Sequence, residues 1–118
     1  MKMPPDEGCR RCRLCEGRTT IVLPSGDRRS PVALVGEAPG EQEDLRGEPF
    51  VGRAGRTLDR LMAEAGLERG AVLITNTVKC RPPGNRRPKA DEMAACRPFL
   101  LEELAGKTFV LALGLSAA

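Results

Sequence analysis

The apolar positions of this chain gather in short runs separated by stretches of mixed polarity, which predicts alternating strands and helices. Three runs that are apolar or β-branched suit buried strands, at residues 31–35 (PVALV), 71–78 (AVLITNTV) and 109–113 (FVLAL). Two helical faces lie between these runs, and they consist of Ala54, Leu58, Leu61, Met62 and Ala65, followed by Gly66, and of Met93, Cys96, Leu100 and Leu104. Pro98 lies within the second helix and is expected to interrupt and kink it.

The order strand, helix, strand, helix, strand predicts an α/β fold with a parallel sheet and right-handed crossovers. We expect one domain in the 118 residues, with a cysteine-rich and turn-rich segment at 1–30 and a βαβαβ core at 31–118. Ligands of such sheets bind at the carboxyl ends of the strands. The loop at 36–40 (GEAPG) and Asn76 lie at the ends of two predicted strands, so they should line one crevice.

Composition narrows the class of protein only a little. Apolar residues make up 41% and charged residues 30% of the chain, which is ordinary for a soluble globular protein. The first residues do not resemble a signal peptide, and no apolar run approaches the roughly 20 residues of a membrane span. We therefore expect a cytoplasmic monomer without a membrane partner. The absence of histidine and tyrosine excludes a histidine base or a tyrosine acid from these 118 residues.

The basic residues are clustered, although the net charge is only +3 and the sequence pI is about 8.7. One group consists of Arg10, Arg11, Arg13 and Arg18, and the other of Arg81, Arg86, Arg87 and Lys89. Arginine side chains suit phosphate oxygens, which favours a nucleic acid as the partner. A solvated basic surface is the alternative interpretation.

The candidates for a metal site are the cysteines Cys9, Cys12, Cys15, Cys80 and Cys96. Disulfides are rare in the cytosol, and three thiols spaced by two residues are too crowded for simple bridges. A structural zinc prefers two close pairs, whereas an iron–sulfur cluster accepts four thiolates and is often bound by C-x2-C-x2-C runs. The spacing favours a cluster over zinc or unliganded buried cysteines, and it leaves the odd cysteine undecided.

Four segments together resemble the family 4 uracil-DNA glycosylases, which carry an iron–sulfur cluster. The segments are 9–19 (CRRCRLCEGRT), 35–44 (VGEAPGEQED), 47–55 (GEPFVGRAG) and 74–86 (ITNTVKCRPPGNR), with weaker support from 112–118 (ALGLSAA). They follow the family's order over nearly the whole chain. The resemblance implies a three-layer α/β/α fold with a central parallel sheet. It also implies uracil-containing DNA as the substrate and hydrolysis of the N-glycosidic bond of uracil, which starts base-excision repair.

The resemblance assigns roles to individual residues. It implies a 4Fe–4S cluster held by Cys9, Cys12, Cys80 and Cys96, with Cys15 as the spare cysteine. The implied uracil pocket consists of Gly36, Glu37, Ala38, Phe50 and Asn76, and the implied catalytic residues are Glu37, Glu43 and Asn85. DNA phosphates would be contacted by Arg81, Arg86, Arg87 and Lys89, which position the DNA without reading its sequence.

The residue types at these positions suit the chemistry of a glycosylase, which extrudes a base and holds it in a pocket. Phe50 offers a stacking surface, and the Asn76 amide offers a donor and an acceptor that match O4 and N3–H of uracil but not cytosine. A loop anchor at Phe50 and a strand-end cap at Asn76 are the alternatives. Glu37 or Glu43 would orient water or stabilise the sugar cation, and the sequence does not rank the two.

The chain departs from the family pattern at its end. The family's histidine–proline segment lies beyond the GxxAA motif, whereas this chain contains no histidine and ends at Ala118. We therefore expect a C-terminally truncated domain with weak activity at best and with exposed apolar surface on its third strand. The competing hypotheses are a non-catalytic iron–sulfur module that binds DNA and a zinc-stabilised structural domain.

Overall fold

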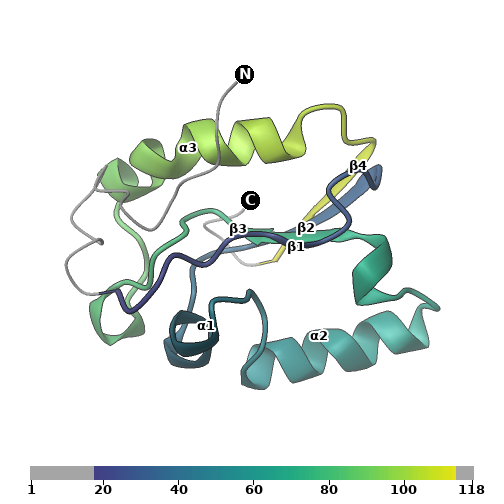
Figure 1. Ribbon diagram of the computed structural model, residues 1–118, viewed down its shortest axis with the longest axis horizontal. Coiled ribbons are helices and arrows are strands. Elements are labelled where there is room, and N and C mark those ends of the chain that lie inside the picture. Colours follow the sequence, from purple (N-terminus) through teal and green to yellow (C-terminus); the bar gives the residue numbers. More distant parts are fainter. Residues whose placement is uncertain (1–17, 114–118) are drawn as a thin grey trace.

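The structure, a computed structural model, describes residues 18–113, and its centre is a four-stranded sheet (Figure 1). The strands are β1 (Ser25–Gly26), β2 (Val32–Gly36), β3 (Leu73–Asn76) and β4 (Phe109–Ala112), in the spatial order β1-β3-β2-β4. β2 is parallel to both β3 and β4, and only β1 runs antiparallel to its neighbour. The predicted parallel sheet is therefore confirmed, with β1 as an additional edge strand that the sequence pattern did not reveal.

Helices cover both faces of this sheet. They are α1 (Glu41–Arg46), α2 (Arg53–Glu64) and α3 (Ala90–Leu104), and the single turns η2 (Arg69–Ala71) and η3 (Pro83–Asn85) are 3₁₀ helices. Figure 1 shows α3 on one side of the sheet and α1 and α2 on the other. This arrangement confirms the three-layer α/β/α architecture. Within residues 18–113, every helix is too short or too polar to cross a membrane.

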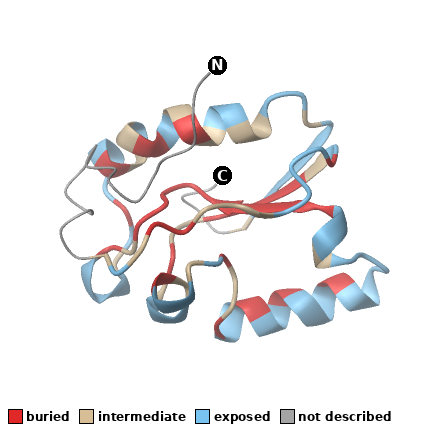
Figure 2. Cartoon of the chain, viewed as in Figure 1, coloured by how far each residue is buried: buried red, intermediate tan, exposed pale blue. Residues whose placement is uncertain are grey.

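Two apolar clusters fill the spaces between the layers. The cluster beneath α2 consists of Leu34, Leu58, Met62, Val72 and Ile74, and the cluster beneath α3 consists of Ile21, Val78, Cys80 and Cys96. Figure 2 shows that the buried residues follow the strands and the helix surfaces that face them. Burial of these side chains is the main stabilising term, because each large apolar side chain contributes about 1.5–3 kcal/mol when it leaves water.

Several predicted boundaries shift in the structure. β3 ends at Asn76 and not at residue 78, because its parallel partner β2 ends at Gly36, the residue paired with Asn76. β2 begins one residue after Pro31, which lacks a backbone N–H and only accepts hydrogen bonds there, from Thr108 and Phe109. The expected interruption at Pro98 is wrong, because α3 continues through it.

The helices also differ in detail from the pattern. The sequence pattern did not predict α1, because its six residues are too few to show helical periodicity. In α2 the buried positions are Gly55, Leu58 and Met62, whereas Leu61 of the predicted face is 54% exposed. The predicted buried strand at residues 109–113 forms β4, but all its residues are exposed. Its apolar surface is uncovered in the described part of the chain, as we expected for the third strand.

A buried ion pair lies between β3 and α3. Lys79 Nζ donates to Glu103 Oε1 at 2.7 Å, to Thr75 Oγ1 at 2.7 Å and to the Asn76 carbonyl at 2.6 Å. The side chains of Lys79 and Glu103 are only 1% and 4% exposed. Glu103 Oε2 is buried without a hydrogen-bond partner among the described residues. The pair is therefore closely matched on the lysine side and incompletely satisfied on the carboxylate side.

Removing one member of this pair should destabilise the protein more than removing both. We expect Lys79→Met to lower the free energy of unfolding by about 3–5 kcal/mol, because Glu103 would remain buried without its counter-charge. Lys79→Met combined with Glu103→Leu should recover most of that loss, because apolar replacements of buried pairs are often neutral. Urea unfolding of the single and double variants measures both values. Equal losses in the single and the double variant would contradict this account.

Candidate active site

The site begins with the register of β2 and β3, which places Gly36 directly opposite Asn76 at the carboxyl ends of both strands. The Gly36 carbonyl accepts from the Thr77 backbone N–H at 2.9 Å and from Thr77 Oγ1 at 3.1 Å. A side chain at Gly36 would collide with the Phe50 ring and with Asn76 Oδ1. Only glycine therefore lets these two side chains meet over the strand ends. The prediction that the loop after β2 and Asn76 line one crevice is confirmed.

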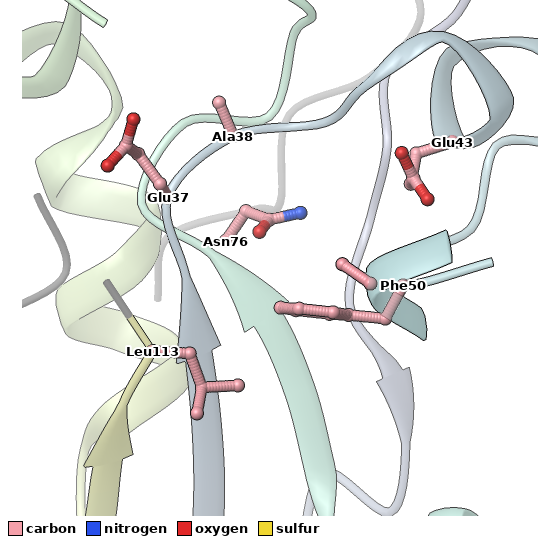
Figure 3. A pocket seen from close by; sticks show the side chains of 7 residues that line it. Glu37, Ala38, Glu43, Phe50, Asn76 and Leu113 are labelled. Atoms are coloured by element: carbon pink, nitrogen blue, oxygen red, sulfur yellow. The ribbon is translucent and has the colours of Figure 1, made fainter. Parts of the chain in front are cut away.

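A cavity of about 110 Å³ opens at this point (Figure 3), and it is lined by Glu37, Ala38, Glu43, Phe50, Ala54, Asn76 and Leu113. A single water needs only about 10–15 Å³ of such volume, so the cavity accepts a larger group. Its lining combines apolar surface with a few polar side chains, which is typical of small-molecule sites. Ala54 and Leu113 are lining residues that the sequence analysis did not name.

Asn76 is the buried polar group of the cavity. The residue is 4% exposed, and Figure 3 shows its amide directed into the space between Ala38 and Phe50. Within residues 18–113 no hydrogen-bond partner is found for this amide, whereas the Asn76 backbone carbonyl accepts from Lys79. The amide faces the cavity, so a ligand that fills the cavity and pairs with it avoids the cost of about 1–3 kcal/mol that an unpaired buried amide would carry. The expected alternative, an Asn76 side chain that caps its own strand end, receives no support from these contacts.

Phe50 lies with its ring beneath the Asn76 amide, on the opposite side of the cavity from Ala38 (Figure 3). The ring also packs against the apolar cluster beneath α2, so Phe50 is both a loop anchor and a wall of the cavity. Its backbone has φ of 55°, a left-handed conformation that is unusual for a bulky residue. Such a conformation costs on the order of 1–3 kcal/mol and persists only where neighbouring contacts enforce it.

The carboxylate of Glu43 accepts hydrogen bonds from the backbone of the surrounding loops. Its Oε1 accepts from the Gly40 N–H at 2.8 Å, and its Oε2 accepts from the N–H groups of Val51 at 3.0 Å and Gly52 at 2.8 Å. Burial raises the pKa of Glu43, but the hydrogen bonds from Gly52, Val51 and Gly40 outweigh this effect, so its pKa lies below the ordinary value. A carboxylate with three backbone donors and a lowered pKa suits a structural role better than that of a base.

Glu37 has a different environment. Its side chain is 28% exposed and lines the cavity, and its Oε1 lies 3.8 Å from Arg87 Nε on the solvent side. Neither oxygen accepts a hydrogen bond from the backbone in the described part of the chain. Of the two glutamates that the sequence left unranked, Glu37 is therefore the one whose carboxylate is not taken up by backbone N–H groups within residues 18–113.

The other predicted polar residues lie outside the cavity lining. Asn85 Oδ1 accepts from Arg81 Nε at 2.7 Å, so the structure gives Asn85 a contact with the basic loop and none with the cavity. Arg86 forms two 2.8 Å hydrogen bonds with the fully buried carboxylate of Glu92, which raise the pKa of Arg86. Arg87 is 62% exposed, and Lys89 is also exposed. A catalytic role for Asn85 and phosphate contacts for the four basic residues stay predictions.

Comparison with known proteins identifies the family. Residues 23–118 match the sequence profile described as "Uracil DNA glycosylase superfamily". This chain belongs to the uracil-DNA glycosylase superfamily. Three relatives carry the name "Type-4 uracil-DNA glycosylase". They come from Sulfurisphaera tokodaii (52% identity over 93 residues), Saccharolobus solfataricus (48% over 97 residues) and Thermotoga maritima (47% over 111 residues).

The matched regions cover most of this glycosylase-superfamily chain but only part of each relative. They amount to 78%, 81% and 92% of this chain, and to 42%, 45% and 58% of the proteins from S. tokodaii, S. solfataricus and T. maritima respectively. The chain thus spans about half the length of the curated relatives that it matches. This match establishes the family and its fold.

Two of the four cysteines predicted for this superfamily member as cluster ligands lie together in the structure. Cys80 and Cys96 are both buried in the apolar cluster beneath α3, although they are sixteen positions apart. Arg18 Nη1 donates to Cys80 Sγ at 3.4 Å. The residue Arg18, which follows the C-x2-C-x2-C run in the sequence, therefore contacts the apolar cluster that contains Cys80. Cys9, Cys12 and the spare Cys15 lie outside the described residues. Within residues 18–113, no group of three or more side chains suited to a metal assembles.

Replacing Glu43 should destabilise the loops around the cavity in a pH-dependent way. We expect Glu43→Gln to lower the free energy of unfolding at pH 7 by about 1–2 kcal/mol, because the neutral amide accepts less strongly from three N–H groups and the site is partly exposed. The folded-state pKa is lowered, so the contribution of Glu43 is present above the ordinary carboxyl pKa of about 4.3 and is lost as the pH falls through the lower folded value.

Denaturant unfolding between pH 7 and pH 3 measures this difference, with Glu41→Gln as the matched control on the exposed side of α1. The difference in the free energy of unfolding between wild type and Glu43→Gln should become smaller as the pH falls. The free energy of unfolding of Glu41→Gln should stay close to that of wild type throughout. A constant gap across this range would contradict the assignment.

Proposed function

We propose that this chain supplies the base-binding part of a uracil-DNA glycosylase, which hydrolyses the N-glycosidic bond between uracil and deoxyribose in DNA. The observation that carries the proposal is the Asn76 amide, which faces the cavity beside the Phe50 ring and has no hydrogen-bond partner within residues 18–113. An extruded base needs a pocket with a stacking surface and hydrogen bonds to its edge. The names of the relatives support uracil as that base.

Asn76 would read the edge of the base. Its amide N–H donates to O4 of uracil, and its amide oxygen accepts from N3–H, so both groups become paired at once. Cytosine presents the reverse pattern and would leave buried groups unsatisfied at a cost of about 1–3 kcal/mol each. The ring of Phe50 would stack on the flat face of the base, which contributes on the order of 1–3 kcal/mol without selecting a sequence.

Glu37 would act at the sugar. When the N-glycosidic bond breaks, the sugar becomes cationic at C1′ and the uracil leaves as an anion. A carboxylate at the mouth of the cavity stabilises the cation and accepts a hydrogen bond from the water that attacks C1′. Glu37 is exposed enough to meet such a water, and its solvent-side neighbour Arg87 is suited to an adjacent phosphate. Glu43 would hold the loops and take no direct part.

The basic loop after β3 would bind the DNA backbone. Arg87 is exposed beside Glu37 of the cavity lining, Lys89 is exposed on the same loop, and Arg81 is held by Asn85. Arg86 is bound to Glu92 and would order the loop rather than act as the principal phosphate contact. Contacts of this type position the DNA and weaken with rising salt concentration.

A 4Fe–4S cluster is part of the proposal. Cys80 and Cys96 would hold it together with Cys9 and Cys12, and the convergence of the first two cysteines in one buried cluster supports this ligand set. The thiolates of cysteine are the ligands that such clusters prefer. When bound, the cluster would supply a cross-link between the N-terminal segment and the segment from Cys80 to Cys96 and no step of the hydrolysis. We also propose that the chain is a monomer of the cytoplasm.

Uracil release is the direct test of the enzyme hypothesis. We expect the iron-loaded chain to release uracil slowly from a single-uracil oligonucleotide and to release no base from the matching thymine or cytosine oligonucleotides. Asn76→Ala should lower kcat/KM by at least tenfold, because it removes two hydrogen bonds to the base. Chromatography of the released base measures both rates.

The other outcomes of this test are equally definite. A folded, iron-loaded chain that binds the oligonucleotide without releasing uracil would favour the non-catalytic DNA-binding module. Release that is unchanged in Asn76→Ala would contradict the proposed pocket.

Iron and sulfide analysis tests the cofactor. We expect about four iron and four sulfide per chain, and we expect Cys80→Ala and Cys96→Ala each to lose most of both. Cys15→Ala is the matched control and should retain the full content, because the resemblance leaves Cys15 without a ligand role. One zinc per chain without sulfide would replace the cluster hypothesis with the zinc-stabilised domain.

A further inference from the structure

We propose that Arg69 is a positioning residue that, oriented by Asp59, holds the ring of Phe50 against the base in the cavity. Arg69 lies in η2, on the connection between α2 and β3, and it does not line the cavity. Uracil as the base rests on the function proposed above, whereas the positioning of the ring rests on contacts of the chain alone.

The guanidinium of Arg69 binds two consecutive carbonyl groups of the loop. Nη1 donates to the Phe50 carbonyl at 2.7 Å, and Nη2 donates to the Pro49 carbonyl at 2.8 Å. Nη1 also donates to Asp59 Oδ1 of α2 at 2.8 Å. The planar fork of arginine is suited to this geometry, because its N–H groups point in fixed directions toward separate acceptors. A lysine carries the same charge but presents a single nitrogen.

One of these carbonyl groups belongs to Phe50, whose backbone conformation is unfavourable, and the other belongs to the residue before it. Phe50 has φ of 55°, so the loop needs external contacts to keep this conformation. On the N–H side, Val51 and Gly52 donate to Glu43. On the carbonyl side, Arg69 Nη1 donates to the Phe50 carbonyl. The Phe50 N–H donates no backbone hydrogen bond in the described part of the chain. Glu43 and Arg69 thus hold the loop from opposite sides.

The Phe50 loop is packed on both sides, between α2 and β2. The Phe50 carbonyl lies so close to Gly55 of α2 that any side chain there would collide with it, and a side chain at Gly36 would collide with the Phe50 ring. The loop is therefore packed tightly between α2 and β2, and a change in its backbone moves the ring. Asp59 is 51% exposed, and such surface ion pairs add little stability. Its role is to orient the guanidinium.

The experiment uses the 118-residue chain and the variants Arg69→Lys, Asp59→Asn and Arg60→Lys. Arg60 is an exposed arginine of the same helix as Asp59 and serves as the matched control. Phe50 is one of three aromatic residues in a chain without tyrosine or tryptophan, so its ring protons are readily assigned by NMR. Two quantities are measured: the nuclear Overhauser effect between the Phe50 ring and Gly36, and the dissociation constant for free uracil.

We expect Arg69→Lys to weaken the ring-to-Gly36 signal strongly and to raise the dissociation constant for uracil by about five- to 150-fold, the range that loss of one stacking contact gives. Asp59→Asn should show a smaller change in the same direction, and Arg60→Lys should match wild type. Melting curves of all variants identify any that fail to fold. If Arg69→Lys fails to fold, Asp59→Asn decides the question alone.

An unchanged ring signal and a dissociation constant within twofold of wild type in the folded Arg69 and Asp59 variants would overturn the proposal. The Arg69→Lys result alone would then mean that a positive charge at this position is enough, without the two-carbonyl geometry of arginine. A wild-type chain that shows the ring signal but binds no uracil would instead count against the function proposed above. In that case the ring signal of the variants still decides whether Arg69 positions Phe50.

Discussion

The parallel pairing of β2 with β3 is the constraint on which the candidate site depends. Because Gly36 faces Asn76 across this pair, the loop after one strand and the amide at the end of the other lie at the same edge of the sheet. The absence of a side chain at Gly36 then decides how close the Phe50 ring approaches Asn76. A shift of one residue in this register would remove the amide from the cavity, since alternate residues of a strand point to opposite faces.

The loop that carries Phe50 is stabilised by charged side chains and not by its own secondary structure. Glu43 accepts from N–H groups on either side of α1 and at the start of α2, and Arg69 donates to carbonyl groups on the other side of the same loop. Charged hydrogen bonds of this type are stronger than neutral ones. Because Glu43 accepts these backbone hydrogen bonds, it lines the cavity without offering a free carboxylate. These bonds also show why Glu37 and Glu43 differ, although both are near the cavity.

Sequence reasoning identified the parts of the site that depend on local pattern. Alternating apolar runs predicted β2, β3, β4, α2 and α3, and the strand order then predicted which edge carries Gly36 and Asn76. It missed the six-residue α1 and the two-residue β1, which are too short to show periodicity. It also missed Arg69, because an arginine in a turn of η2 has no local signal. Its importance arises only from tertiary contacts with Pro49 and Phe50.

The segment from Asn76 to Cys80 connects the candidate pocket with the proposed cluster. All five of its residues are buried. Its backbone is hydrogen-bonded to the end of β2 and to the segments on either side, by the Thr77 N–H to Gly36, the Val78 N–H to Glu37 and the Val22 N–H to the Lys79 carbonyl. The Lys79 ammonium adds a hydrogen bond to the Asn76 carbonyl. Cys80 and Asn76 are thus joined by a short buried segment whose backbone groups are largely hydrogen-bonded. Under the proposed function, ligation of a cluster at Cys80 would fix one end of the segment that begins with Asn76, so the cluster would affect the placement of this amide without contacting the base.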